Sequence, residues 1–177
     1  MKFKYIIFSV LLSFQSLGVQ KAGADANDGD IVLATTPWCP YTCKNNENEF
    51  GYIGIYIQEI FNQLDIPLRI QTYPWSRAIK LAETGKVDGL LTAIHSEAPS
   101  LLFTEAPISS YQMCFFTKTN NNWSYKLPLT FNRNILAVTQ DYGYGEPLDS
   151  IIKESPSIIK IGGHDNSERL VTLLIKE

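Results

Sequence analysis

The chain has 177 residues, of which 45% are hydrophobic and 12% aromatic, and its formal net charge is -3. This length suits one domain or two small lobes, and the composition excludes an intrinsically disordered chain. The chain is acidic and its mature part has no run of Lys or Arg, so it is a poor candidate for binding nucleic acid.

The first 24 residues are typical of a secretory signal peptide. Lys2 and Lys4 form a basic start, residues 5–14 form an apolar core, and an A-x-A cleavage pattern ends at Ala24. The apolar core is too short to span a bilayer as a helix, so an uncleaved anchor is the less favoured alternative. We therefore expect an exported protein that is cleaved after Ala24 and located in the periplasm.

The mature chain opens with alternating strands and helices. Apolar runs, helical spacing and a glycine stop predict, in chain order, a strand at 31–35, a helix at 53–64, a strand at 68–73, a helix at 75–84 and a strand at 87–93. Such alternation with short connections favours a parallel sheet.

A further strand is expected at 111–118, before a polar boundary that contains three consecutive Asn. The pattern then restarts with a strand at 135–139, a helix at 146–154, a strand at 157–161 and a helix at 166–175. The sequence ends inside this last helix. We therefore expect an α/β protein with a nearly complete first lobe at 25–118 and a truncated second lobe at 119–177.

The cysteines indicate an oxidising compartment. Cys39 and Cys43 are expected to form a disulfide that pins a surface loop. Together with the preceding Trp38, the cysteines resemble the W-C-x-x-C motif of thiol-disulfide oxidoreductases. However, their spacing is one residue longer than C-x-x-C, and no helical pattern follows to lower a thiol pKa. That enzyme stays an alternative. Cys114 lies in an apolar run and is expected to be a small buried residue.

Several candidate ligand-binding residues stand at the ends of predicted strands, where α/β sheets bind ligands. Trp38, Tyr41 and Trp75 are candidates to wall a pocket, with ordinary core packing as the alternative. Arg77 is the only Arg near the predicted cleft, and it either clamps an anion or pairs with a surface acid. Thr92 lies at the carboxyl end of the third predicted strand and would offer its hydroxyl.

Tyr142 is a further candidate, because it lies in a glycine-rich turn before a predicted helix whose N–H groups favour anions. His95 and His164 have no cysteine or acid at ligand spacing, so no metal site is predicted. The sequence contains no G-x-S-x-G and no H-E-x-x-H motif. We therefore expect a protein without catalytic activity, metal or cofactor.

Four motifs occur in a fixed order: G-Y-I-G-I-Y-I at 51–57, P-W-S-R-A at 74–78, G-K-V-D-G at 85–89 and F-T-E-A-P at 103–107. Looser matches follow at 135–138, 142–145 and 163–165. Together these motifs resemble the extracellular solute-binding proteins of family 3, the periplasmic receptors of polar amino-acid ABC transporters. The resemblance runs from about residue 31 to the C-terminus.

This resemblance implies a two-lobed, periplasmic-binding-protein-like (type II) fold, in which 111–118 is the outward crossing between lobes. It implies a monomer that holds a small polar or amino-acid-like solute between the lobes and presents it to ABC transporter membrane subunits. Asp165 matches the position that faces the ligand ammonium. The usual Arg that clamps the ligand carboxylate is missing from 94–100, so Arg77 is its candidate replacement. A ligand-sensing domain of a larger receptor is a further alternative.

Overall fold

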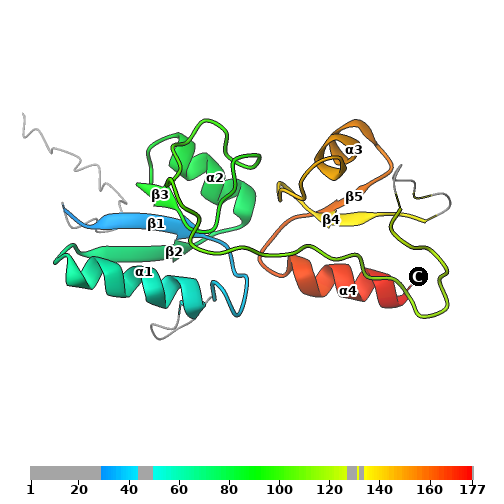
Figure 1. Ribbon diagram of the computed structural model, residues 1–177, viewed down its shortest axis with the longest axis horizontal. Coiled ribbons are helices and arrows are strands. Elements are labelled where there is room, and N and C mark those ends of the chain that lie inside the picture. The colour runs from blue at the N-terminus through cyan, green and yellow to red at the C-terminus, as the bar shows by residue number, and fades with distance from the viewer. Residues whose placement is uncertain (1–28, 44–49, 127–130, 132–133, 177) are drawn as a thin grey trace, which may run out of the picture.

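The computed structural model describes residues 29–43, 50–126, 131 and 134–176. The elements form two α/β units, one after the other along the chain (Figure 1). The expected signal peptide lies outside the described residues. The mixed α/β class with parallel strands is confirmed, whereas the type II assignment stays a prediction.

The first unit is a three-stranded parallel sheet with one helix on each face (Figure 1). Strand β1 (Ile31–Thr35) lies in the middle, between β2 (Leu68–Thr72) and β3 (Gly89–Leu90). Helix α1 (Gly51–Gln63) packs against β2, and α2 (Trp75–Glu83) packs against β1 and β3. The predicted β-α-β-α-β order and its parallel pairing are therefore confirmed.

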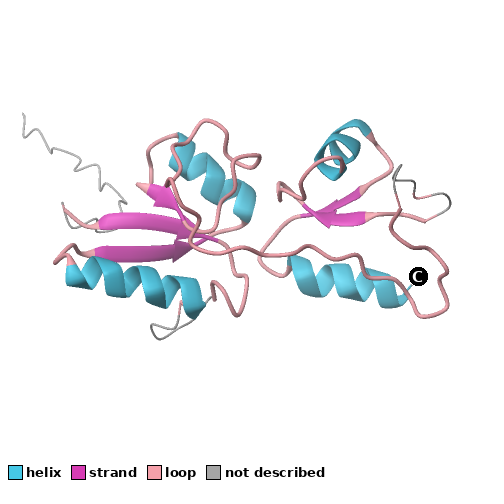
Figure 2. Cartoon of the chain, in the orientation of Figure 1, coloured by secondary structure: helices cyan, strands magenta, loops and turns pink. Residues whose placement is uncertain are grey.

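The second unit repeats this layering on a smaller scale. Strands β4 (Ala137–Thr139) and β5 (Ile159–Ile161) pair in parallel. Helix α4 (Asn166–Lys176) packs against both strands, and α3 (Leu148–Glu154) lies on the opposite side of them (Figure 1). A long segment drawn as loop in Figure 2 connects the two units.

The core of the first unit lies between α2 and the sheet. The buried residues of α2 are Trp75, Ala78, Ile79 and Ala82, which recur at the i, i+3, i+4, i+7 spacing of one helical face. They contact Ala34 in β1, which is completely buried. Alanine on both sides lets the helix approach the sheet closely, and this fixes where the first turn of α2 stands.

Helix α2 ends at the glycine that the sequence predicted as its stop. Gly85 has φ +64°, in the left-handed region that residues other than glycine rarely adopt. Its N–H donates to Ala82 O at 3.0 Å, and the Lys86 N–H donates to Leu81 O at 2.8 Å. These two bonds satisfy the last carbonyls of the helix and turn the chain toward β3.

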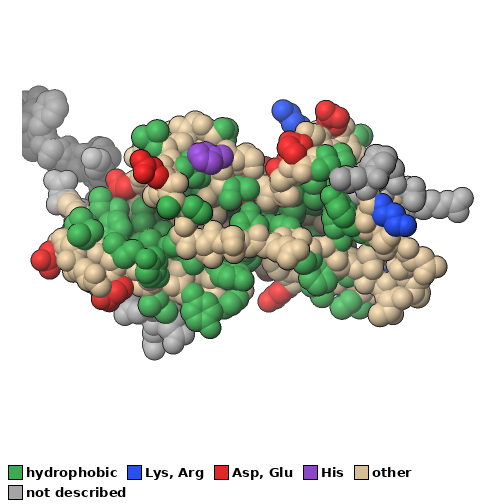
Figure 3. Space-filling view, viewed as in Figure 1, with side chains coloured by type: hydrophobic (Ala, Val, Ile, Leu, Met, Phe, Trp, Pro, Cys, Tyr) green, Lys and Arg blue, Asp and Glu red, His purple; other side chains and the backbone are tan. Residues whose placement is uncertain are grey.

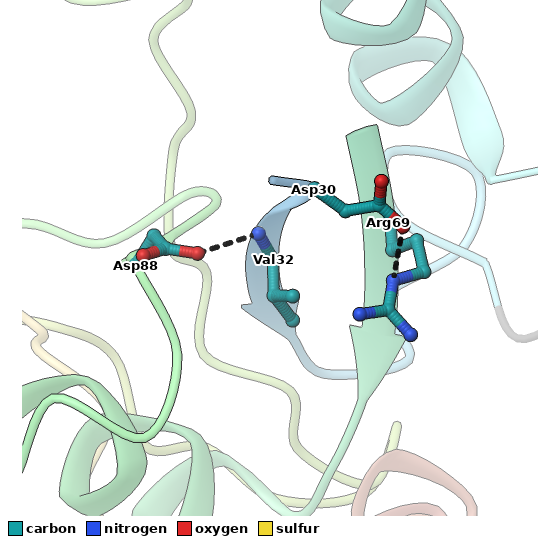
Figure 4. Close-up of polar contacts among 4 residues, drawn as sticks. All are labelled: Asp30, Val32, Arg69 and Asp88. Carbon is teal, nitrogen blue, oxygen red and sulfur yellow. Dashed lines mark hydrogen bonds and ion pairs between the residues drawn. The ribbon is translucent and has the colours of Figure 1, made fainter. Parts of the chain in front are cut away.

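Polar contacts hold the amino end of β1 (Figure 4). The Val32 N–H donates to the Asp88 carboxylate at 2.7 Å, and the Asp88 N–H donates back to Val32 O at 2.8 Å. Beside them, Arg69 Nε lies 3.1 Å from Asp30 Oδ2. These contacts anchor the end of the sheet that is opposite to the carboxyl ends of the strands.

Two expectations about strands are wrong. The third strand covers only Gly89–Leu90 instead of 87–93, because Thr92 has φ +66° and turns the chain out of the sheet. Segment 111–118 forms no strand, since no described strand runs beside it to accept its backbone hydrogen bonds. Cys114 lies on this unpaired segment and is exposed, so the prediction of a buried cysteine is also wrong.

Candidate ligand-binding site

A small cavity lies at the carboxyl ends of β1 and β3, where the two units meet. Its volume is about 10 Å³, room for about one water molecule. Four of its lining residues carry aromatic rings, two are threonines, and one is a carboxylate. The lining residues are Thr36, Trp38, Trp75, Thr92, Glu97, Tyr111, Met113 and Tyr142.

A larger and more open hollow of about 370 Å³ adjoins this cavity. It is bordered by α2 through Ser76 and by α3 through Asp149 and Lys153. Glu97 and Tyr142 line both spaces, so they stand at the boundary between the small cavity and the hollow. A volume of this size is typical of small-molecule sites.

The cavity brings together four of the residues that the sequence suggested, namely Trp38, Trp75, Thr92 and Tyr142. Tyr41 does not line it. Its ring packs against Trp38 with centroids 4.8 Å apart, and 39% of its surface is exposed. The structure therefore places Tyr41 behind the wall that Trp38 forms.

Arg77 and Asp165 also lie outside both linings. Arg77 is exposed, and its guanidinium carbon lies 5.2 Å from the centroid of the Tyr73 ring. Asp165 is exposed before α4, where its carbonyl accepts the Arg169 N–H at 3.1 Å. The geometry gives no support to Arg77 as an anion clamp in the cavity or to Asp165 as the partner of an ammonium there.

The sequence did not suggest Thr36, Glu97, Tyr111 and Met113, which complete the lining. Thr36 directly follows β1, so the rule about strand ends would have found it. Glu97 lies five residues beyond Thr92, in a loop whose sequence gives no local signal for a buried carboxylate. Tyr111 and Met113 belong to the segment that the sequence predicts as a strand, and the structure shows it as an irregular segment that passes the site.

Glu97 is the carboxylate of the site. Its Oε2 accepts the Ile94 N–H at 3.0 Å and its Oε1 accepts the Gly143 N–H at 2.8 Å. Burial raises the pKa of Glu97 above its ordinary value, with a smaller contribution from Asp149, while the two N–H bonds and the nearby Trp75 indole oppose this rise. These contacts therefore offset only part of the free energy that the Glu97 carboxylate loses when it is removed from water.

Two buried polar atoms at the cavity have no hydrogen bond of acceptable geometry within the described structure. Trp75 Nε1 is close enough to Glu97 to lower its pKa but does not form a proper bond with it. Thr36 Oγ1 stands in the same relation to the Tyr142 hydroxyl. An unsatisfied buried polar group costs about 1–3 kcal/mol, and the Thr36 hydroxyl can accept a hydrogen bond from a polar occupant of this space, whereas the Trp75 indole N–H can only donate one.

Tyr142 closes the cavity from the second unit. Its ring meets that of Trp75 edge-on with centroids 6.3 Å apart, and it packs against the core of the first unit. Burial raises its pKa to about 12, assisted by the charges of Glu97 and Tyr144 and opposed by contacts with Asn166 and Thr36. The phenol is therefore neutral at physiological pH.

Thr92 has an unusual backbone conformation at the edge of the site. Its φ of +66° is rare for a β-branched residue, and its hydroxyl donates to the preceding Leu91 carbonyl at 2.6 Å. Strained residues of this kind cluster at functional sites. The conformation ends β3 and turns the following chain toward Glu97.

The predicted disulfide between Cys39 and Cys43 is present. It closes a turn in which Trp38 pairs with Thr42, whose buried hydroxyl donates to Thr36 O at 2.8 Å. The turn holds Trp38 beside the cavity. Helix α1 begins at Gly51 and not directly after Cys43, and the Tyr52 and Ile53 N–H groups of its first turn donate to Pro40 O and Tyr41 O at 3.0 Å, which fixes the turn against the helix.

Gly143 of the second unit lies tightly against the first unit. A Cβ at this position would lie 2.4 Å from Ile94 Cδ1 and 2.6 Å from Ser96 Oγ. The Tyr111 hydroxyl also donates to Gly143 O at 3.5 Å. Only a residue without a side chain lets the Gly143 N–H reach Glu97.

Replacing Gly143 with valine is expected to force this contact apart. The branched side chain would overlap Ile94 and remove the hydrogen bond to Glu97, with a loss of about 1–2 kcal/mol in the free energy of unfolding. Urea unfolding would measure the loss. Adding Ile94→Ala should restore part of it by making room, and an unchanged urea midpoint in the single variant would contradict this account of the contact.

Comparison of the chain with protein-family models, curated proteins and solved structures found no match. Within the described residues, no cluster of three or more His, Cys, Asp or Glu is placed to hold a metal ion. None of the described helices has the length and apolar character needed to span a bilayer.

Proposed function

We propose that this chain is an exported, non-catalytic solute-binding protein. It captures a small polar or amino-acid-like solute between its two α/β units and presents it to ABC transporter membrane subunits. The observation that carries the proposal is the cavity at the carboxyl ends of parallel strands, lined by four aromatic rings, by Glu97 and by two buried polar atoms without a well-formed hydrogen bond in the described structure.

The contacts between the units support binding by closure. Tyr142 and Gly143 come from the turn after β4, and they contact Trp75 and Glu97 of the first unit. The cavity holds no more than about one water in this arrangement, so a solute reaches it only when these contacts open. Hinged units that close over a ligand are a common way to build such a site.

The sequence motifs support the same proposal, since they resemble those of periplasmic amino-acid receptors. The disulfide agrees with export to an oxidising compartment, because such bonds are rare in the cytosol. Delivery to a transporter is the part of the proposal that rests on the resemblance alone.

A thermal-shift screen of amino acids, amines, small carboxylates and neutral polyols tests the proposal. A ligand present at a hundred times its Kd adds about 2.7 kcal/mol of stability. For a chain of this size, that corresponds to a rise in Tm of roughly 5–10 °C. Hits would be checked by calorimetric titration, and a screen in which no class of solute raises Tm would contradict the proposed function.

A further inference from the structure

The charge at the boundary of the cavity is negative and has no cationic partner among the described residues. Both oxygens of Glu97 accept backbone N–H groups, and no described Lys, Arg or His lies within 4.0 Å of them. Asp149, whose charge also acts on Glu97, has the same sign. A partly buried carboxylate in this situation is stabilised by a cation that arrives with the ligand.

The aromatic walls of the cavity also favour a cation. Trp75 lies close enough to Glu97 to lower its pKa, and the Glu97 charge acts on Tyr111 and Tyr142. Trp38 completes the wall, with its ring 5.1 Å from that of Tyr111. Aromatic faces attract cations and have no comparable attraction for anions.

Two basic side chains line the hollow and none lines the small cavity. Lys153 and Lys160 border the larger space, and neither lines the space that holds the four rings. On the face shown in Figure 3, the visible Lys and Arg side chains lie over the second unit and none lies over the first. An anionic group of a ligand would therefore be placed in the hollow, away from Glu97.

The size of the cavity restricts the cation further. A volume of about 10 Å³ accepts a group the size of one water, which matches a primary ammonium and is too small for a trimethylammonium. Glu97 and Tyr142 line both spaces, so a chain attached to this ammonium would continue into the hollow of about 370 Å³.

We propose that the solute carries a primary ammonium group, which enters the small cavity and pairs with the Glu97 carboxylate between the rings of Trp38, Trp75, Tyr111 and Tyr142. This inference rests on the proposed function and adds the chemical class of the ligand. The rest of the solute lies in the hollow, where Lys153 and Lys160 accommodate any carboxylate that it carries.

A series of five-carbon probes tests the inference on the unmodified chain. Cadaverine and aminovalerate each carry a primary ammonium, pentanediol is neutral, and glutarate carries two carboxylates. Titration followed by tryptophan fluorescence is expected to show binding of the two amines at least about tenfold tighter than binding of the diol or the diacid. The N-trimethyl derivative of aminovalerate, a size control, is expected to bind as weakly as the diol.

Glu97→Gln is expected to weaken cadaverine binding by about tenfold or more, because the amide cannot pair with the ammonium. Glu105→Gln is the matched control, since Glu105 is exposed in a nearby loop and lines neither space. The probe series needs no variant, so it decides the question even where Glu97→Gln does not fold.

Equal binding of glutarate or pentanediol, equal binding of the trimethylated probe, or undiminished binding by Glu97→Gln would each overturn the inference. A solute from the wider screen that lacks an amine would also overturn it and leave the proposed function intact. A solute that carries an amine but binds Glu97→Gln as tightly as the unmodified chain would likewise overturn the inference and leave the proposed function intact. Failure of every solute, in the screen and the probe series alike, would instead contradict the proposed function itself.

Discussion

Replacing Trp75 with alanine is expected to lower the free energy of unfolding by about 3–5 kcal/mol. The side chain is only 3% exposed, contacts the buried Ala34 and Ala78, and meets the Tyr142 ring. Its removal leaves a void where α2 meets the sheet, and the second unit loses an aromatic contact. Since a domain is stable by only about 5–15 kcal/mol, urea unfolding followed by circular dichroism should register a large shift in midpoint.

Trp75→Phe is the matched control for this prediction. It keeps an apolar ring in the core and removes the indole N–H, which has no well-formed hydrogen bond within the described structure. We therefore expect phenylalanine to cost less than half as much as alanine. A loss below about 1 kcal/mol for Trp75→Ala would contradict the central place of this residue in the core.

The sequence predicted the first unit well because its local signals agree with its packing. The apolar spacing of α2 placed Trp75 at the start of the helix, and Gly85 marked where the helix ends. A short apolar run between turn signals also identified β1 as Ile31–Thr35. In each case a local pattern and the burial of one face point to the same structure.

Segment 111–118 was misassigned because pairing depends on a neighbour that local sequence does not specify. The apolar run that includes Cys114 has the composition of a strand, but no described strand lies beside it. Without a partner the run crosses between the units as extended chain and exposes the cysteine. Strand propensity largely reflects packing against neighbours, so it fails where the neighbour is absent.

Only part of the site could be predicted, because local sequence does not specify contacts between segments that are distant along the chain. Trp38, Trp75 and Thr92 follow from the rule that ligands bind beyond the carboxyl ends of parallel strands. Glu97 does not, because its role comes from its approach to Gly143, which lies 46 residues away in the sequence. The sequence predicts Arg77 as a cation that clamps a carboxylate of the ligand, whereas the structure places the Glu97 carboxylate at the cavity and Arg77 outside it.

Alkaline pH is expected to destabilise the protein through Tyr142. The folded environment raises its pKa to about 12 from an ordinary value of 10.0. The phenol therefore loses its proton more readily in the unfolded chain, and unfolding is favoured as the pH rises from about 10 through 12. Each pKa unit corresponds to about 1.4 kcal/mol, so the full effect is about 2–3 kcal/mol, present below pH 10 and lost by about pH 12.

Tyr142→Phe isolates this effect, because a phenylalanine ring fills the same space and cannot ionise. The difference in free energy of unfolding between the two proteins should be constant up to about pH 10 and then shift by about 2–3 kcal/mol in favour of the variant. Burial also raises the pKa values of Tyr111 and Tyr144, so both proteins share their contribution and it cancels in the difference. Tyr52→Phe, at a position 71% exposed, should have the same free energy of unfolding as the unmodified protein at every pH.

Parallel urea midpoints for Tyr142→Phe and the unmodified protein from pH 8 to pH 12 would contradict this prediction. They would mean that Tyr142 is not held neutral by burial between the units, and the closed arrangement of the cavity would have to be abandoned.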